Sequence, residues 1–238
     1  MSENNTENKN NEESGNFEEE EFNKDFEILS PETLDVDYNY KLIVIGDSGV
    51  GKTCLTYRAS NGEFQQNMAA TIGFEFFPFI TKYKNKTIKL EIWDTCGQEA
   101  YRSLIKSFFN NSSLAIIVYA VDNERSFKSI DEWIRQCRGL CSPGTRFFLI
   151  GNKNDVPNKV IKTEEGKQIA DDNKFDLFLE TSAKSGLNVI KLFCYAAKIL
   201  YEDSVKKSEV NKDIDPEILK QIKLSKKNAS SKKKKCCS

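Results

Sequence analysis

The stretch GDSGVGKT, residues 46–53, lies between an apolar run and a helix-like segment and contains three glycines, a lysine and a threonine. The spacing GxxxxGK[ST] is typical of a phosphate-binding loop, in which backbone N–H groups surround a polyphosphate at a helix N-terminus. Glycine permits backbone angles and close approaches that a β-carbon would hinder. We expect Lys52 to reach the outer phosphates and the Thr53 hydroxyl to bind Mg²⁺. The alternative is a glycine-rich turn that matches the pattern by chance.

Short apolar runs alternate with amphipathic stretches between Tyr40 and about Tyr201. Helical periodicity covers residues 124–140, 163–173 and 188–201, and the expected strands contain the runs 41–45, 74–80, 87–93, 113–121, 146–151 and 175–180. Such alternation predicts an α/β fold with helices on both faces of a mostly parallel six-stranded sheet. The second and third runs predict a hairpin. Because Pro78 has no N–H to donate, its strand is expected to be the single antiparallel edge strand.

The two ends of the 238-residue chain carry opposite charge, although the net charge is −1. Residues 1–38 are rich in Asn and Glu and bury too little apolar surface to offset their ordering entropy, so they are predicted to be a disordered acidic extension. Residues 39–203 are expected to form one globular domain. Residues 204–238 are rich in Lys and Ser and are predicted to be a flexible basic tail, in which residues 214–224 could form a short helix.

No segment approaches the roughly 20 apolar residues that span a bilayer, and the first residues lack the apolar region of a signal peptide. We therefore expect a cytosolic protein. Seven cysteines without paired CxxC spacing, in a chain that has no histidine, predict reduced thiols. Cys137 and Cys141, one helical turn apart, are expected to be packing residues.

Two further motifs follow apolar strands, NKND at 152–155 and TSAK at 181–184. Ligands bind at the carboxyl ends of strands in open α/β sheets. The Asp155 carboxylate can accept both the N1–H and the N2–H₂ of guanine, and adenine offers no such donor pair. NKND alone also fits an ordinary Asx turn. The predicted nucleotide contacts from the three motifs are Asp47, Ser48, Gly49, Val50, Gly51, Lys52, Thr53, Cys54, Asn152, Lys153, Asp155, Ser182, Ala183 and Lys184.

Within this set, Asn152 is expected to brace the loops and the Lys153 stem to cover the base. The Ala183 N–H is expected to donate to the guanine oxygen. The discrimination available to such hydrogen-bonding sites is large, because the wrong ligand leaves buried polar groups unpaired. The order of the motifs along the chain therefore predicts a guanine nucleotide.

Residues 40 to about 202 resemble a small GTPase of the Ras superfamily and are most similar to the Rab family. Besides the three motifs, the resemblance is carried by ATIGFEF (70–76) and KLEIWDTCGQEAYRS (89–103). It implies the P-loop NTPase fold of small G proteins, GTP/GDP and Mg²⁺ as ligands, and slow GTP hydrolysis. The implied role is a membrane-anchored switch in vesicle-mediated transport.

The resemblance also implies further site residues. Thr71 corresponds to the threonine that closes on Mg²⁺ when the γ-phosphate is present, and Asp94 to the acidic residue near the metal, so the expected metal set is Thr53, Thr71 and Asp94. The expected catalytic set is Lys52, Gly97 and Gln98: the Gly97 N–H corresponds to the one that touches the γ-phosphate, and Gln98 to the glutamine that positions the attacking water.

Phe64 corresponds to the aromatic residue that packs against guanine; alternatively, it is a loop aromatic resting on the core. The sequence departs from the family pattern at two positions. Cys96 stands where the family usually has alanine, beside the expected hinge, and we hypothesise that it perturbs this hinge or slows hydrolysis. The alternative is a tolerated small residue. Ala120 stands where Rab-like sequences commonly have aspartate, a structural position, so nucleotide binding should survive.

Phe76, Trp93 and Phe108 match aromatic residues that face effectors in Rab proteins, with core packing as the alternative for each. Cys236 and Cys237 resemble the double-cysteine endings of Rab proteins, which are geranylgeranylated, and the neighbouring lysines 232–235 would add attraction to anionic lipid. The alternatives are a solvated lysine run, a nuclear address or stray thiols.

The implied partners are an exchange factor, a GAP, effectors, a prenylation escort protein and a GDP-dissociation inhibitor. We expect a monomer that does not bind nucleic acid and that cycles between the cytosol and the cytoplasmic face of intracellular membranes. Two other functions stay open at this point. One is a GTP- or GDP-dependent binding scaffold that barely turns over, to which Cys96 points. The other is a P-loop kinase or ATPase, which NKND and TSAK disfavour.

Overall fold

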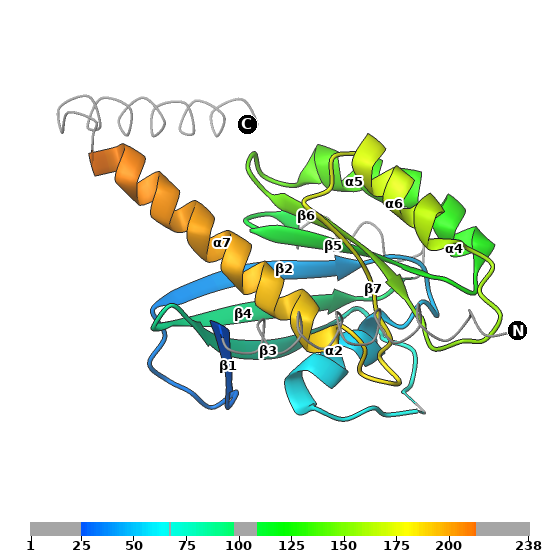
Figure 1. Cartoon of the computed structure of the whole chain (residues 1–238), viewed down its shortest axis with the longest axis horizontal. Helices are drawn as coiled ribbons and strands as arrows, with labels where there is room; N and C mark the ends of the chain where they lie inside the picture. Colours follow the sequence, from blue (N-terminus) through cyan, green and yellow to red (C-terminus); the bar gives the residue numbers. More distant parts are fainter. Residues whose placement is uncertain (1–24, 67, 98–108, 213–238) are drawn as a thin grey trace, which may run out of the picture. The chain divides into compact units, whose positions relative to one another are not determined.

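Residues 25–66, 68–97 and 109–212 are described by the computed structural model, and within them the strands form one seven-stranded sheet of order β1-β3-β4-β2-β5-β6-β7 (Figure 1). The strands are β1 (Phe26–Leu29), β2 (Tyr38–Ile45), β3 (Phe74–Tyr83), β4 (Lys86–Thr95), β5 (Leu114–Ala120), β6 (Arg146–Asn152) and β7 (Leu177–Glu180). The helices are α2 (Lys52–Asn61), α4 (Glu124–Lys128), α5 (Ile130–Leu140), α6 (Thr163–Asp172) and α7 (Val189–Lys212). The predicted α/β fold is confirmed.

The sheet is parallel from β4 through β7, and β3 pairs antiparallel with both β1 and β4. All residues of β5 are buried, as expected for a central parallel strand covered on both faces. Figure 1 shows α5 and α6 on one side of the sheet and α2 on the other. On the first side, α5 contributes Trp133 and Ile134 to a cluster of buried residues, here called the core cluster, which also contains Ile43, Cys96 and Ile117.

The strand β1 lies inside the segment predicted to be disordered, so that prediction is wrong for residues 26–29. These residues pair with β3 from Tyr83 to Ile80. The Phe26 ring stacks on that of Tyr83 with 4.9 Å between centroids, and the Thr81 hydroxyl donates to the Glu27 carbonyl. The composition of residues 1–38 does not reveal this strand, because the four residues FEIL are averaged with their acidic surroundings. The strand is stabilised by the edge of β3 at residues 80–83, which lies far away in sequence.

This pairing also makes the predicted count of six strands wrong and displaces β3 from the edge of the sheet. The predicted hairpin is nevertheless confirmed, with Tyr83 opposite Lys86 and positive φ angles at both Lys84 and Asn85, as a two-residue type I′ turn requires. Pairing between β1 and β3 ends at Ile80. Pro78 therefore pairs with β4 alone, and its lack of an N–H removes no hydrogen bond to β1.

The predicted helix over 124–140 is two helices, α4 and α5, which are separated at Ser129. The helix predicted over 163–173 is confirmed as α6. The last helix, α7, continues to Lys212, so the predicted flexible tail is wrong for residues 204–212. Lysine and glutamate favour helix, and adding a residue to an existing helix costs far less than starting one.

The chain divides into two units between residues 198 and 199, and the predicted end of the globular domain at residue 203 stays a prediction. The short helix considered for residues 214–224 lies outside the described residues, as do residues 1–24 of the acidic extension. None of the helices in the described part of the chain combines the length and the apolar character that a bilayer crossing requires.

We predict that Phe26→Ala lowers the free energy of unfolding by about 1–2 kcal/mol, because it removes a stacked aromatic pair and part of the buried area. Leu34→Ala is the control, since the side chain of Leu34 is 97% exposed and its loss should change little. Urea unfolding of both variants measures the difference. Equal midpoints for Phe26→Ala and the unchanged protein would show that β1 contributes nothing.

Candidate functional site

The loop between β2 and α2 needs glycine at particular positions. Gly46 has φ 141°, and a β-carbon there would lie 2.1 Å from the Val118 carbonyl oxygen of the neighbouring strand β5. Gly51, the residue before α2, has φ 91° in the left-handed region. Both requirements bring the loop close to the strand ends and turn its chain directly into a helix N-terminus.

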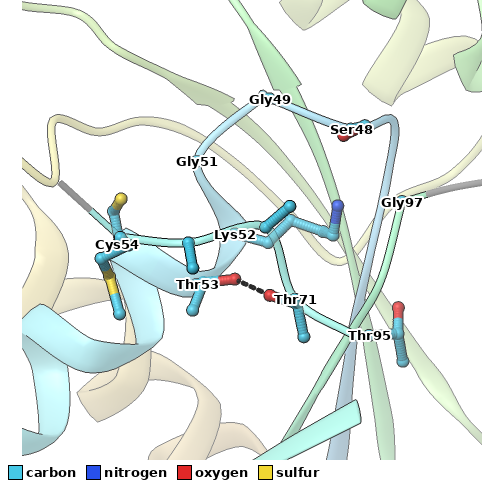
Figure 2. Close-up of a pocket in the computed structure, with 12 residues that line it drawn as sticks. Ser48, Gly49, Gly51, Lys52, Thr53, Cys54, Thr71, Thr95 and Gly97 are labelled. Carbon is cyan, nitrogen blue, oxygen red and sulfur yellow. Dashed lines mark hydrogen bonds between the residues drawn. The ribbon is translucent and has the colours of Figure 1, made fainter. Parts of the chain in front are cut away.

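A pocket opens at this loop, and Figure 2 shows the side chains that surround it. Of the residues predicted to bind nucleotide or metal, those that line it are Ser48, Gly49, Gly51, Lys52, Thr53, Cys54, Thr71 and Gly97. The lining also includes Met68, Ala69, Ala70 and Thr95, which the sequence analysis missed. Apart from their position beside Thr71 and Asp94, these four residues gave no signal in the sequence. Asp47 and Val50, although predicted, do not line the pocket.

Lys52 is buried, with 5% of its surface exposed. Its ammonium donates to the carbonyl oxygens of Gly46 (2.9 Å) and Asp47 (2.8 Å). Burial lowers the pKa of Lys52, whereas attraction to Asp94 and Asp47 opposes that shift. An ammonium has three N–H donors, so one remains for an oxygen in the pocket beyond these two hydrogen bonds.

Thr53, Thr71 and Asp94 bring three oxygen atoms together beside Lys52. The Thr53 hydroxyl donates to Asp94 Oδ2 (2.5 Å) and lies 2.6 Å from the Thr71 hydroxyl, the contact dashed in Figure 2. Asp94 Oδ1 is buried and has no hydrogen-bond partner among the described residues. Burial raises the pKa of Asp94 to about 6, against the effects of the Thr53 hydrogen bond and the Lys52 charge. The cluster therefore offers hard oxygen ligands in a setting that favours an added cation.

Gly97 follows β4 and touches the loop through its backbone. A β-carbon at Gly97 would lie 2.4 Å from both the Asp47 carbonyl carbon and the Ser48 nitrogen. The contact therefore joins the chain after β4 to the first peptide units of the loop. Gln98 and Phe108 lie outside the described residues, so their predicted roles stay predictions.

Asn152, at the end of β6, connects this loop to the TSAK segment. Its side-chain amide nitrogen donates to the Val50 carbonyl (2.9 Å), and its oxygen accepts from the Thr181 hydroxyl (3.2 Å) and the Ala183 N–H (3.3 Å). Asn152 is 1% exposed, so these bonds are shielded from water. The side chain thus joins three segments that are far apart in sequence.

The remaining predicted base contacts, which are Lys153, Asp155, Ser182, Lys184 and Phe64, do not line the pocket. Asp155 Oδ1 accepts from the Ser182 hydroxyl (2.6 Å), and the Lys184 ammonium lies 4.0 Å from its other oxygen. Lys153 adopts φ 66° and pairs with Asp122 at 3.6 Å. Phe64 is half-buried in the loop after α2.

The Asp47 carboxylate contacts helix residues. It accepts from the Ser129 hydroxyl (2.7 Å) and from the Trp133 indole N–H (2.8 Å). Asp47 was predicted to bind nucleotide, and neither partner was predicted. The partners are more than 80 positions away, and a single sequence contains no signal for contacts over such a distance.

A group of aromatic side chains lies on the strand pair β3 and β4. Phe76 and Trp93 face each other across the ladder, with ring centroids 5.6 Å apart. Phe74, two residues before Phe76 and 49% exposed, lies 5.4 Å from the same Trp93 ring. The sequence analysis missed Phe74, although the period-two alternation of a strand places it on the face of Phe76.

Cys96 is 2% exposed and belongs to the core cluster. It does not line the pocket, although both of its neighbours do. Ala120 is fully buried at the end of β5, and its N–H donates to the Ser126 hydroxyl. Both departures from the family pattern therefore lie in the interior.

Comparison with known proteins agrees with this geometry. A model of the Ras family matches residues 41–202. Ras-related protein Rab-8B of Dictyostelium discoideum is 41% identical over 182 residues, which are 76% of this chain and 87% of the relative. Ras-related protein RABA1b of Arabidopsis thaliana is 36% identical over 208 residues, 86% of this chain and 96% of the relative. Ras-related protein Rab-8A of Pongo abelii is 39% identical over 176 residues, 74% and 84% of the two chains.

The chain belongs to the Ras family and is a Rab-type small GTPase. It is accordingly a GTP-binding protein of vesicle-mediated transport that hydrolyses GTP. Members of this superfamily bind guanine nucleotide, typically with Mg²⁺, and act with regulators and effectors.

We predict that Cys96→Ala leaves single-turnover GTP hydrolysis and nucleotide exchange within about twofold of the unchanged protein. The physical reason is that the thiol packs into the core cluster and does not line the pocket. The same variant should lose about 1 kcal/mol of folding free energy, because it removes one buried heavy atom. A tenfold change in hydrolysis at unchanged nucleotide affinity would instead support the hypothesis that Cys96 slows turnover.

Proposed function

We propose that the pocket at residues 46–53 holds the phosphates of GTP, and that Thr53, Thr71 and Asp94 hold Mg²⁺ there. The observation that carries this proposal is the buried Lys52 ammonium beside the clustered oxygens of Thr53, Thr71 and Asp94. The second oxygen of the Asp94 carboxylate, Oδ1, is buried and has no hydrogen-bond partner among the described residues. When bound, Mg²⁺ supplies positive charge that neutralises the phosphate oxygens. A buried carboxylate with hydroxyl neighbours suits that ion, which prefers oxygen ligands.

The residues of the chain then share the work of phosphoryl transfer, which requires positioning and charge neutralisation more than covalent chemistry. Lys52 directs its remaining N–H donor toward the outer phosphates. The N–H groups of the loop, together with the Gly97 N–H after β4, donate to phosphate oxygens. From resemblance alone, we predict that Gln98 orients the attacking water.

We further propose that Thr71 and Gly97 connect the phosphates to two segments of the chain. Thr71 lies between α2 and β3, and Gly97 follows β4. Both residues line the pocket, and neither lies within a described helix or strand. Loss of the γ-phosphate would remove one contact from each segment, so the segments would relax and effectors would read the difference.

Base recognition is proposed for the side of the site held by Asn152. Asp155 accepts from guanine, Ala183 donates to the guanine oxygen, and the Lys153 stem and Phe64 cover the base. The Ser182 hydroxyl supports this assignment, because its 2.6 Å bond to Asp155 Oδ1 fixes the carboxylate that must meet the base. Asn152 keeps this carboxylate in register with the phosphate loop through its contact to Val50.

The alternative of a scaffold that barely turns over is not favoured by the Rab-type relatives. The feature that pointed to it, Cys96, packs in the interior and does not line the pocket. An ATP-specific enzyme is disfavoured because a carboxylate at Asp155 would meet the N1 acceptor and the C2–H of adenine where guanine has the N1–H and N2–H₂ donors.

We propose that effectors contact the aromatic surface formed by the exposed side chains of Phe74 and Phe76 and by the half-buried Trp93, which also packs against the core cluster. The regulators proposed from resemblance are an exchange factor, a GAP, a prenylation escort protein and a GDP-dissociation inhibitor. Cys236 and Cys237, which lie outside the described residues, are proposed as lipid attachment sites. Two lipid chains and the lysines before them would hold the protein at the cytoplasmic face of intracellular membranes.

The test of base recognition is Asp155→Asn. Asparagine presents an N–H₂ donor to the guanine donors, so GDP affinity should fall by about 10²- to 10⁴-fold, the loss of one or two charge-assisted hydrogen bonds. Xanthosine diphosphate, which has an oxygen in place of the N2 amine, should bind the variant better than GDP does. Isothermal titration calorimetry measures both affinities.

Asp176→Asn is the matched control, because Asp176 accepts from the Phe147 N–H and pairs with Arg146, with no contact to the site. This control should keep the GDP affinity of the unchanged protein. Equal GDP binding by Asp155→Asn and the control would contradict the proposed base site. Equal affinity of the unchanged protein for ATP and GTP would contradict the guanine assignment altogether.

A further inference from the structure

The carboxylate of Asp47 is held by two donors from the region where α4 meets α5. Ser129 Oγ donates to Asp47 Oδ2 at 2.7 Å, and the indole N–H of Trp133 donates to Asp47 Oδ1 at 2.8 Å. Both oxygens of the carboxylate are thus engaged by residues that do not line the pocket. Hydrogen bonds to a charged acceptor are the stronger kind, about twice as strong as neutral ones.

The two donors are fixed in place by their own surroundings. Trp133 is 3% exposed in the first turn of α5 and belongs to the core cluster, so packing sets the direction of its single N–H donor. Ser129 is the N-cap residue of α5, yet its hydroxyl makes no capping bond to that helix. The hydroxyl lies closer to Asp47 Oδ2 than to its other acceptor, the Arg125 carbonyl at 3.0 Å.

The backbone of Asp47 is equally constrained, on its other side. The Asp47 carbonyl oxygen accepts from the Lys52 ammonium at 2.8 Å. The same carbonyl group abuts Gly97, where a β-carbon would lie 2.4 Å from the carbonyl carbon and 2.6 Å from the oxygen. One peptide unit therefore touches Lys52 and Gly97, the second residue after β4, while the Asp47 side chain is held by Ser129 and by Trp133 of α5.

We propose that Ser129 and Trp133 are positioning residues for the phosphate loop, and this inference rests on the proposed nucleotide function of that loop. They fix the Asp47 carboxylate, and through it the carbonyl that orients Lys52 and the surface against which Gly97 packs. Neither residue touches the nucleotide. Their effect is on how tightly the loop holds it, so loosening them speeds the release of GDP.

A purely structural role for the same bonds makes a different prediction. A buried indole N–H needs a hydrogen-bond partner in any protein, so Asp47 could simply satisfy Trp133. In that case a substitution would lower folding stability and leave GDP release unchanged. The two roles are therefore separated by comparing the GDP dissociation rate with the free energy of unfolding in the same variants.

The main variant is Trp133→Phe, which removes the N–H donor and keeps an aromatic ring in the core cluster. The control is Ile134→Val, which trims the neighbouring residue of the same cluster, is 6% exposed in the unchanged protein and has no bond to Asp47. Displacement of a fluorescent GDP analogue by excess GDP measures release. Trp133→Phe should release the analogue about tenfold faster than the unchanged protein. Ile134→Val should stay within twofold.

Ser129 provides an independent check that does not alter the core cluster. Ser129→Ala should speed release about fivefold, and Ser129→Thr, which restores a hydroxyl, should recover most of the original rate. Asp47→Ala removes the acceptor of both bonds. Adding Trp133→Phe to Asp47→Ala should then change release by less than twofold, because the indole has lost its target.

Three results would decide against the inference. Trp133→Phe releasing the analogue no faster than Ile134→Val, at comparable loss of stability, would leave the indole bond a purely structural one. If the rate increases of Trp133→Phe and Asp47→Ala instead multiplied in the double variant, the two residues would act separately on GDP release. Failure of the unchanged protein to retain the analogue would overturn the proposed nucleotide function itself, which distinguishes that failure from the first two.

Discussion

The site depends on the burial of the Lys52 ammonium against the backbone of its own loop. A charge that is 5% exposed must be compensated, and the carbonyls of Gly46 and Asp47 provide that compensation. Those carbonyls can point at Lys52 only because residue 46 is a glycine. Any β-carbon at that position would collide with the Val118 carbonyl oxygen of β5. The path of the loop into α2 and the position of the ammonium therefore depend on the same packing arrangement.

Around this arrangement, two polar side chains connect parts of the chain that are distant in sequence. Asn152 joins the loop to the segment that contains Thr181 and Ala183, and Asp47 joins it to α5. Asn152 is 1% exposed and Asp47 is half-buried, and the loss of one partner of a hydrogen bond is most costly where water is excluded. The loop is consequently held from two directions, by Asn152 of β6 and by the partners of Asp47 at α5.

Much of this could be read from the sequence, and what was missed has a physical explanation. Apolar runs identify buried parallel strands such as β5, and GxxxxGKT identifies the loop, because both signals are local. The strand β1 was missed because its four residues gain stability from an edge formed by residues 80–83. The Asp47 to Trp133 bond was missed because side-chain direction depends on packing. Met68 and Ala69 line the pocket because of the path that the backbone takes between α2 and β3, and that path is not written in any local motif.

The register of β1 decides where anything attached ahead of it emerges. β3 begins at Phe74, close to the Thr71 end of the pocket, and Phe26 pairs with Tyr83 at the opposite end of that strand. A fluorescent protein or affinity handle joined directly at residue 25 would therefore start from the end of β3 that lies farther from the phosphate loop.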